Sequence, residues 1–384
     1  MPQDLDALSP VERIATDPAE DRPAEGLALC LSGGGYRAML FHLGALWRLN
    51  ELGYLPRLDR VSSVSGGSIT AGVLGLHWGD LGFDAAGVGG RFQASVVEPV
   101  RGLASKTIDA GAIIEGILTP GESIADEVAE AYRDRLFGRR TLQDLPERPR
   151  FVINATNVQS LSLWRFSRPY MRDYRVGEVR NPTVELAVAV AASSAFPPVL
   201  SPLVLELEES DFTPGSGELQ RPPFTTKVVL TDGGVYDNLG LETAWKRHRT
   251  ILVSDGGGRT EFEPEPKRDW ARHTYRILNV IDNQVRSLRK RQVIGSFKAG
   301  ARRGAYWGIR TEIAKYGLDD ALDCPVDKTT ALANTATRLK ALSGEIQERL
   351  INWGYAVCDA AMRAHVDRSL PRPSGFPFPG AALG

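Results

Sequence analysis

Short apolar runs alternate with helical stripes of apolar residues along the first two thirds of the chain. Leu27–Leu31 is a continuous apolar run that ends near glycine, which is typical of a strand covered on both faces. Beyond the glycines, Met39, Leu43 and Leu46 recur at helical spacing and predict a helix that packs on this strand. A second apolar run, Val61–Val64, predicts the next strand.

The same alternation continues toward the middle of the chain. We predict further strands at residues 151–158, 227–230 and 250–254, and a buried, alanine-rich helix at residues 184–196. Strands that alternate with helices build parallel sheets whose two faces are covered by those helices. The predicted fold is therefore a three-layer α/β fold, with a mainly parallel sheet flanked by helices and an additional helical C-terminal region.

Changes in composition divide the chain into four parts. Residues 1–25 are polar and punctuated by proline, and predict an N-terminal tail. Residues 26–260 carry the strand and helix alternation of the α/β domain. Residues 261–370 predict a mainly helical region packed on that domain, and residues 371–384 a tail rich in proline and glycine that is extended or disordered.

Two groups of apolar residues outside the predicted sheet have an expected role. In the C-terminal region, the residues expected to make buried contacts include Trp270, Tyr275, Leu278, Val285 and Leu288. Within the α/β domain, the candidates for an apolar lid are Ile113, Ile114, Ile117 and Leu118.

Composition narrows the environment and the partners. The 46 lysines and arginines nearly balance the 47 aspartates and glutamates, which argues against a nucleic-acid partner. Three widely spaced cysteines fit a reducing compartment and neither a disulfide framework nor a zinc site. The N-terminus lacks the pattern of a signal peptide, and no apolar run is long enough to span a bilayer. We therefore expect a cytoplasmic protein, with any membrane contact peripheral at the inner face.

Two tight turns carry the candidate chemistry. Gly33, Gly34 and Gly35 lie between the first strand and its helix, where backbone N–H groups are left to bind an anion. Ser65 follows the second strand in Ser-Val-Ser-Gly-Gly. This is a G-x-S-x-G pattern in which Ser63 replaces the first glycine. Both turns are expected at one edge of the sheet. This juxtaposition suits acyl transfer, in which a serine attacks a carbonyl and fixed N–H groups hold the oxyanion.

A serine nucleophile needs a base, and Asp232 is the strongest candidate. It follows a predicted strand and precedes Gly233 and Gly234, whereas none of the five histidines has such a setting. A carboxylate base also predicts activity below the ordinary imidazole pKa of about 6.5.

Three motifs together resemble the patatin-like phospholipases. They are Gly33–Arg37 for the family's G-G-G-x-R, Ser63–Gly67 for its G-x-S-x-G, and Asp232–Gly234 for its D-G-G, and Ala192–Pro197 is similar to a further family segment. The resemblance covers roughly residues 26–260. It implies a lipid acyl hydrolase of the phospholipase A or lysophospholipase type, acting through a Ser–Asp dyad and an acyl-enzyme, without a metal or organic cofactor.

The resemblance also implies the roles of particular residues. Ser65 and Asp232 are the expected catalytic dyad, and the expected oxyanion donors are Gly33, Gly34, Gly35 and Gly66. The residues expected to support them are Arg37, Gly233 and Gly234. Arg37 either steadies the glycine loop or faces a lipid phosphate.

Several alternatives remain open at the level of sequence. A soluble carboxylesterase or thioesterase would use the same dyad, and a silent or signal-activated lipid-binding effector would keep the fold. The substrate expected is a phospholipid or lysophospholipid, met through transient contact with a membrane surface. Seven basic residues between Arg286 and Arg303 either form a solvated face or contact anionic headgroups. The sequence does not fix the oligomeric state.

Overall fold

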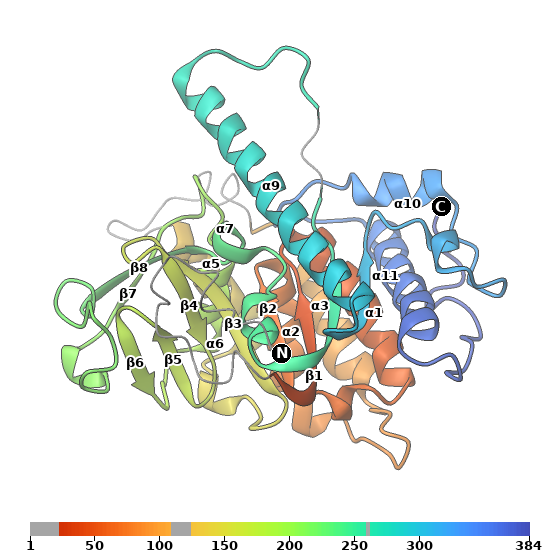
Figure 1. Cartoon of the computed structure of the whole chain (residues 1–384), viewed down its shortest axis with the longest axis horizontal. Coiled ribbons are helices and arrows are strands. Elements are labelled where there is room, and N and C mark those ends of the chain that lie inside the picture. The colour runs from red at the N-terminus through yellow and green to blue at the C-terminus, as the bar shows by residue number, and fades with distance from the viewer. Residues whose placement is uncertain (1–22, 109–123, 259–261) are drawn as a thin grey trace, which may run out of the picture.

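A ten-stranded mixed sheet forms the centre of the protein (Figure 1). The computed structural model describes residues 23–108, 124–258 and 262–384. Eight strands follow one another in the order β10-β9-β1-β2-β3-β4-β5-β6, and β8 pairs with both β3 and β7. The strands are β1 (Ala24–Leu31), β2 (Arg60–Val64), β3 (Arg150–Asn157), β4 (Ser162–Phe166), β5 (Tyr170–Asp173), β6 (Gly177–Arg180), β7 (Leu203–Glu206), β8 (Lys227–Asp232), β9 (His248–Asp255) and β10 (Arg303–Gly308).

The sheet is parallel at its centre and antiparallel toward β6. Strands β10, β9, β1, β2 and β3 are parallel neighbours, whereas β4, β5 and β6 continue from β3 as an antiparallel meander. The predicted fold class is thus confirmed: a mostly parallel central sheet is flanked by helices. One difference is β10, which lies in the region expected to be mainly helical. Its sequence is short and contains two glycines, so its local pattern does not indicate a strand.

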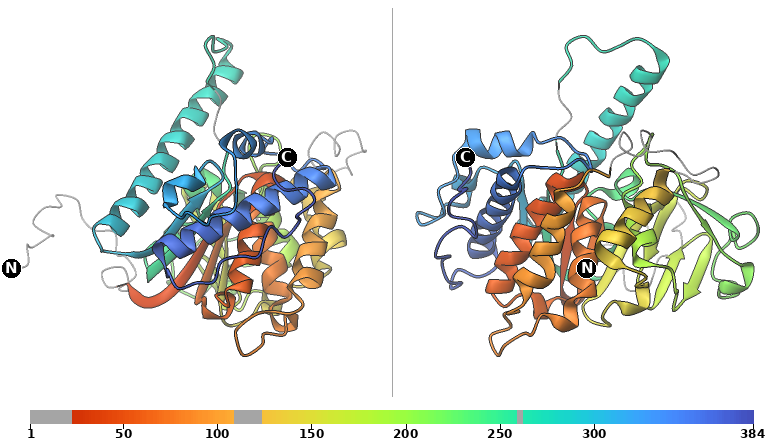
Figure 2. Two further views of the ribbon diagram at one scale, coloured as in Figure 1. Left: turned by 90° about the vertical axis from the view of Figure 1, so that its right-hand side faces the viewer. Right: turned by 180° about the vertical axis from the view of Figure 1, so that it is seen from behind.

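Helices cover both faces of the sheet. The helices are α1 (Gly35–Glu51), α2 (Gly66–Leu76), α3 (Glu98–Ala104), α5 (Ile124–Tyr132), α6 (Leu186–Ser193), α7 (Gly234–Asp237), α8 (Glu242–Trp245), α9 (Trp270–Lys298), α10 (Val326–Ala333) and α11 (Gly344–His365). Short 3-10 or π turns occur at Leu55–Arg57, Trp78–Asp80, Gln93–Val97, Arg133–Phe137, Leu142–Asp144, Glu209–Asp211 and Ile313–Tyr316. Figure 1 views the sheet from the side of α7, α8 and α9, and the second panel of Figure 2 shows α1, α2 and α3 on the opposite side.

The C-terminal helix α11 packs directly against α1. A Cβ atom on Gly44 would overlap the carbonyl oxygen of Ile351, and one on Gly354 would overlap that of Phe41. The two backbones therefore meet at glycines, and no side chain fits between them. Beside this crossing, Trp353 is fully buried, and its indole N–H donates to the Ile309 carbonyl at 2.8 Å. Residues C-terminal to position 261 thus contribute both a strand and a core helix to the fold.

Helix α9 differs most from expectation. Figure 1 shows it crossing the sheet obliquely, with its N-terminal half projecting beyond the carboxyl edge of the parallel strands. Trp270 is 84% exposed, and Tyr275, Leu278 and Leu288 are also exposed, so their predicted burial is wrong. The helical spacing of these residues is real. Helical spacing alone, however, does not say whether anything covers the apolar stripe.

The proline- and glycine-rich end of the chain, for which an extended or disordered tail was expected, packs against the body without regular secondary structure. Asn352 donates to the carbonyl oxygens of Phe378 and Ala382 at 2.8 and 2.7 Å, and the Phe378 ring packs edge-on against Trp47. Leu383 is buried. The four apolar residues proposed for a lid, Ile113, Ile114, Ile117 and Leu118, lie outside the described residues. Within the described ranges, no helix is both long and apolar enough to cross a membrane.

Candidate active site

Ser65 occupies a strained turn between β2 and α2. Its φ of 52° and ψ of −123° are unusual for a residue with a side chain, and strain of this kind is common at nucleophile elbows. The turn is tightly enclosed. A Cβ on Gly66 would overlap the carbonyl oxygen of Gly35, and one on Gly67 would lie 2.5 Å from that of Leu31. Glycine is thus required directly after the serine, and Ser65 itself remains 8% exposed.

Ser63, which replaces the usual first glycine of the motif, fits without distorting the turn. It lies within β2, is fully buried, and its hydroxyl is 3.0 Å from that of Ser68. The extra side chain is therefore absorbed by a buried pair of hydroxyls below the elbow.

Ser193 at the end of α6 joins the elbow to two other strands. The Ser65 N–H donates to Ser193 Oγ at 3.0 Å, and Ser193 Oγ donates to the Asn154 carbonyl at 2.7 Å. The Ser193 carbonyl in turn accepts the Gly233 N–H at 3.2 Å. Sequence reasoning noted the Ala192–Pro197 segment but assigned no role to Ser193. Its buried position at the end of an alanine-rich helix was the available signal.

Asp232 reaches the elbow by an unexpected route. Strand β3 extends past the end of β2, and β8 pairs with this overhang in the antiparallel direction, with Asp232 opposite Ala155. The chain therefore runs back toward Ser65, whereas the sequence predicted a parallel strand end. Asp232 lies in the same turn as Gly233, where a Cβ would overlap the Asn154 carbonyl oxygen.

The Asp232 carboxyl group is buried and unusually basic. Burial raises its pKa to about 7, although the Gly234 N–H and the Ser65 hydroxyl each favour the carboxylate and moderate that rise. Oδ1 accepts the Gly234 N–H at 2.7 Å, and Oδ2 has no hydrogen-bond partner among the described residues that meets ordinary geometry. The expectation that activity persists below the ordinary imidazole pKa of about 6.5 is therefore wrong. With a pKa of about 7, the Asp232 carboxyl group would lose its proton-accepting form over the same pH range as a histidine.

Of the four glycines expected to form the oxyanion site, Gly33 does not fit that role. Its N–H donates to the Asn238 carbonyl at 3.0 Å. The backbone N–H groups of Gly34, Gly35 and Gly66 have no acceptor within the described part of the chain. Gly34 and Gly35 have positive φ values of 141° and 59°, which turn the loop between β1 and α1.

Arg37 braces the glycine loop from within the protein. It is buried, its Nε donates to the Gly256 carbonyl at 3.2 Å, and its Nη1 donates to the Thr335 carbonyl at 2.5 Å. Burial, with help from the nearby Arg286, lowers its pKa to about 10. Both observed contacts are structural, which corresponds to the first of the two expected roles.

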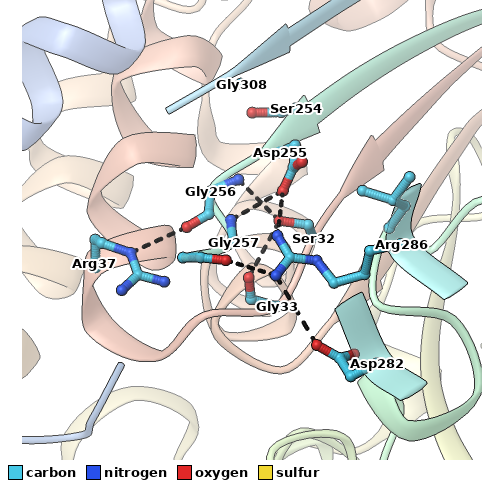
Figure 3. A network of polar contacts seen from close by, with 12 residues as sticks. Ser32, Gly33, Arg37, Ser254, Asp255, Gly256, Gly257, Asp282, Arg286 and Gly308 are labelled. Atoms are coloured by element: carbon cyan, nitrogen blue, oxygen red, sulfur yellow. Dashed lines mark hydrogen bonds and ion pairs between the residues drawn. The ribbon is translucent and has the colours of Figure 1, made fainter. Parts of the chain in front are cut away.

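The glycine loop is also connected to α9 (Figure 3). Arg286 of α9 lies 3.5 Å from Asp255 Oδ1 and donates to the Gly258 carbonyl at 2.6 Å. In the same turn, the Gly256 N–H donates to Ser32 Oγ at 2.9 Å. A continuous set of polar contacts thus runs from the projecting helix to the residue that precedes the oxyanion loop.

None of the five histidines is a hydrogen-bond partner of Ser65 or Asp232 within the described ranges. His42 is the most buried, and its ring nitrogens contact Ser254 Oγ at 2.8 Å and the Ser32 carbonyl at 2.9 Å. Burial lowers its pKa to about 4, so it is neutral at physiological pH. His42 therefore fixes the sheet beneath the glycine loop.

Comparisons with known proteins bear on the family and the fold. The sequence profile of the family described as "Patatin-like phospholipase" matches residues 29–245. The fold is similar to that of human GIVD cytosolic phospholipase A2, with a TM-score of 0.51 and 13% identity over 88% of this chain. The chain spans 60% of the length of that protein. VipD from Legionella pneumophila aligns over 89% of this chain and 67% of its own, with 17% identity and a TM-score of 0.35. No curated protein sequence matches the chain.

Proposed function

Because the chain belongs to the patatin-like phospholipase family, we propose that it hydrolyses carboxylic esters of phospholipids or lysophospholipids through Ser65 and Asp232. The observation that carries the proposal is the pairing of a serine on a strained turn with a buried carboxyl group whose pKa is about 7. A base with a pKa near the working pH is both ionised and able to take a proton. The absence of a histidine partner for either residue in the described ranges supports a dyad.

The first half of the reaction forms an acyl-enzyme. Ser65 Oγ attacks the ester carbonyl carbon while its proton passes to the Asp232 carboxylate. The oxyanion that forms is held by the N–H groups of Gly34, Gly35 and Gly66, which are already fixed by the turn. As the tetrahedral intermediate collapses, the C–O bond to the leaving alcohol breaks, and Asp232 returns the proton to that alcohol oxygen.

The second half releases the fatty acid. Water attacks the acyl carbonyl carbon and gives a proton to Asp232, and the same N–H groups hold the second oxyanion. Collapse breaks the bond to Ser65 Oγ, which recovers its proton from the aspartic acid. The burial of Asp232 contributes twice, because the same group acts as base and as acid in each half.

A fluorophosphonate probe tests the nucleophile. We expect the wild-type protein to gain one adduct, located on the peptide that contains Ser65, and Ser65→Ala to gain none. A catalytically silent lipid-binding protein would not react. An esterase and a lipase are then separated by the rate on a short-chain ester: a steep rise as micelles form supports the lipase, and a rate proportional to monomer supports the esterase.

We propose in addition that the projecting half of α9 makes the transient membrane contact. Leu278 and Ile281 share one exposed face of this half, and Trp270 lies at its outer end. The exposed Leu288 continues the same face into the C-terminal half of the helix. The whole helix has seven lysines and arginines but a single acidic residue, Asp282, and two of the seven, Arg272 and Arg276, lie in the projecting half. An amphipathic helix of this charge suits an anionic bilayer surface. The projecting half extends beyond the edge of the sheet at which β2 ends, directly before Ser65 (Figure 1).

The contacts of the basic residues refine their expected role. Arg286 contacts Asp255, Arg289 pairs with Glu242 at 2.9 Å, and Lys290 lies over the Tyr306 ring, so these charges also hold α9 to the body. The apolar stripe is therefore the sharper target for mutation.

Replacing both Trp270 and Leu278 with serine tests this contact. We expect sedimentation with anionic vesicles to weaken at least tenfold while hydrolysis of a monomeric ester is unchanged. Val204→Ser is the matched control, since Val204 is an exposed apolar residue on β7. Equal vesicle binding by the double variant and the control would refute the role of α9.

A further inference from the structure

Three arginines lie on one face of the sheet, on neighbouring strands β2, β3 and β4. Arg60 and Arg150 are direct neighbours at the amino ends of β2 and β3. Arg165 lies on the adjacent β4 opposite Asn154, four residues further along β3 than Arg150 and on the same face. They share the face of Ala28, which pairs with Arg60 and packs with residues of α8 and α9. Arg60 begins the strand that precedes Ser65, so their backbones are separated by about 16 Å along an extended chain.

A tyrosine lies at the centre of this group. The guanidinium carbons of Arg150 and Arg172 are 6.0 and 5.9 Å from the centroid of the Tyr170 ring. Arg60 hydrogen-bonds to the Tyr170 hydroxyl, and its Nε is 3.2 Å from His248 Nε2. Side chains from β2, β3 and β5 therefore meet at one ring, and His248 at the start of β9 contacts one of them.

The group contains more positive charge than its surroundings neutralise. Arg60 is only 5% exposed, yet its Nη1 has no hydrogen-bond partner in the described residues, and neither does Nε of Arg150 or of Arg165. His248 Nδ1 is also unpaired there. Buried donors without acceptors are rare and costly in folded proteins, so four of them at one place require an explanation.

The nearby carboxylates have other partners, and Asp59, which lies beside His248, accepts the Leu27 N–H at 2.8 Å. Glu242 pairs with Lys246 and Arg289, both at 2.9 Å, and Glu178 pairs with Arg172 and Arg180. Across the described ranges, none of Arg60, Arg150 and Arg165 forms an ion pair with a carboxylate.

The ionisation of the group reflects the same imbalance. Burial lowers the pKa of Arg60, and the neighbouring Arg247 and Arg150 lower it further. Burial opposes the ionisation of Tyr170, but Arg60, Arg165 and Arg247 outweigh it and hold the phenol pKa below its usual value. A local field that favours even a phenolate favours a bound anion.

We propose that Arg60, Arg150 and Arg165 form a binding site for a small phosphate-bearing anion, separate from the Ser65 site. Guanidinium groups donate in pairs to phosphate oxygens, and a phosphate or pyrophosphate group has enough acceptors for the unpaired donors. The partial exposure of Arg150, Arg165, Tyr170 and Arg172 leaves the group open to solvent. The burial of Arg60 favours a soluble anion over the headgroup of a lipid within a bilayer.

Isothermal titration of the full-length protein with inorganic pyrophosphate tests the site, at constant ionic strength set with sodium chloride. We expect saturable binding of one pyrophosphate per chain. Arg150→Gln and Arg165→Gln, made separately, should each weaken binding at least tenfold. Arg139→Gln, which removes an equally positive but exposed side chain, should bind as the wild type does. Circular dichroism identifies any variant that does not fold, in which case the other one decides.

The outcomes separate this site from the proposed hydrolase. All three variants should keep fluorophosphonate labelling at Ser65, so failure of the anion site leaves the dyad unaffected. Vesicles of phosphatidic acid should not compete with pyrophosphate, and competition would instead assign the arginines to a membrane headgroup. No saturable binding by the wild type, or equal binding by the arginine variants and the Arg139→Gln control, would overturn the proposal.

Discussion

Replacing Asp232 with asparagine should stabilise the protein while abolishing its activity, and the stabilisation should depend on pH. Burial raises the Asp232 pKa from 3.8 to about 7. Between these values the native state holds a proton that the unfolded chain has released, so wild-type stability falls as pH rises from about 4 to about 7. Asparagine stays neutral throughout and can still accept the Gly234 N–H through its Oδ1.

The magnitude follows from the size of the shift. A rise of roughly 3 pKa units corresponds to about 4 kcal/mol at about 1.4 kcal/mol per unit, and this is the upper limit of the gain above pH 7. Against a typical total stability of about 5–15 kcal/mol, such a gain is large. The difference between variant and wild type should shrink toward zero near pH 4, where both side chains are neutral.

Urea unfolding at pH 4, 5, 6, 7 and 8 measures this difference directly. Asp134→Asn is the matched control. Asp134 is exposed, so this substitution removes the same charge from the surface and leaves the buried Asp232 carboxyl group in place. We expect the Asp232→Asn curve to separate from wild type progressively above pH 4, and the control to show no such trend. A constant or absent difference for Asp232→Asn would show that this carboxyl group is not held in a strained, basic state, and would remove the physical basis of its assignment as base.

Three further substitutions test other parts of the account. Gly34→Ala should reduce turnover about 10²–10³-fold, because the new methyl group, 2.9 Å from the Ala38 Cβ at a φ of 141°, would displace the loop that carries the oxyanion donors; wild-type turnover in a folded variant would exclude Gly34 from the oxyanion site. Ser193→Ala should lower the unfolding free energy by about 1–3 kcal/mol and slow fluorophosphonate labelling, because the Ser65 N–H loses its acceptor. Labelling at the wild-type rate would contradict the role of Ser193 in holding the elbow. Gly354→Ala should destabilise the protein by about 1–3 kcal/mol or more in urea unfolding. Gly344→Ala is the control and should not destabilise it, because the new methyl group meets nothing within 4 Å. Equal effects of the two substitutions would argue against the close crossing of α1 and α11.

The sequence indicated the parts of the site that depend on local geometry. Three consecutive glycines after an apolar strand, and a serine in a G-x-S-x-G-like turn, each constrain the backbone within a few residues. The structure has both turns at the ends of neighbouring parallel strands, as the right-handed crossover rule requires.

What the sequence did not indicate depends on contacts between distant segments. Asp232 arrives on an antiparallel strand because β3 extends beyond β2, and strand length relative to a neighbour is a property of the whole sheet. Gly33 loses its N–H to Asn238, more than two hundred residues away. Such pairings leave no trace in local spacing.

The error over α9 has a different cause. Apolar residues at helical spacing predicted a buried face, and they do form one continuous stripe from Leu278 to Leu288. The periodicity of a helix reports that such a face exists but not what covers it. The burial of α11 shows the opposite case, since a similar stripe there is enclosed by α1.

Release of fatty acid from phospholipid vesicles is the most direct test of the central claim. Lipids incubated with the wild-type protein, Ser65→Ala, Asp232→Asn, the double variant and each of the five single histidine-to-alanine variants can be quantified by mass spectrometry. We predict equal amounts of free fatty acid and deacylated lipid with the wild type and the folded histidine variants, near-complete loss in Ser65→Ala and Asp232→Asn, and little further loss in the double variant. Undiminished release by Ser65→Ala, or its complete loss in one folded histidine variant, would contradict the assignment of the Ser65–Asp232 dyad.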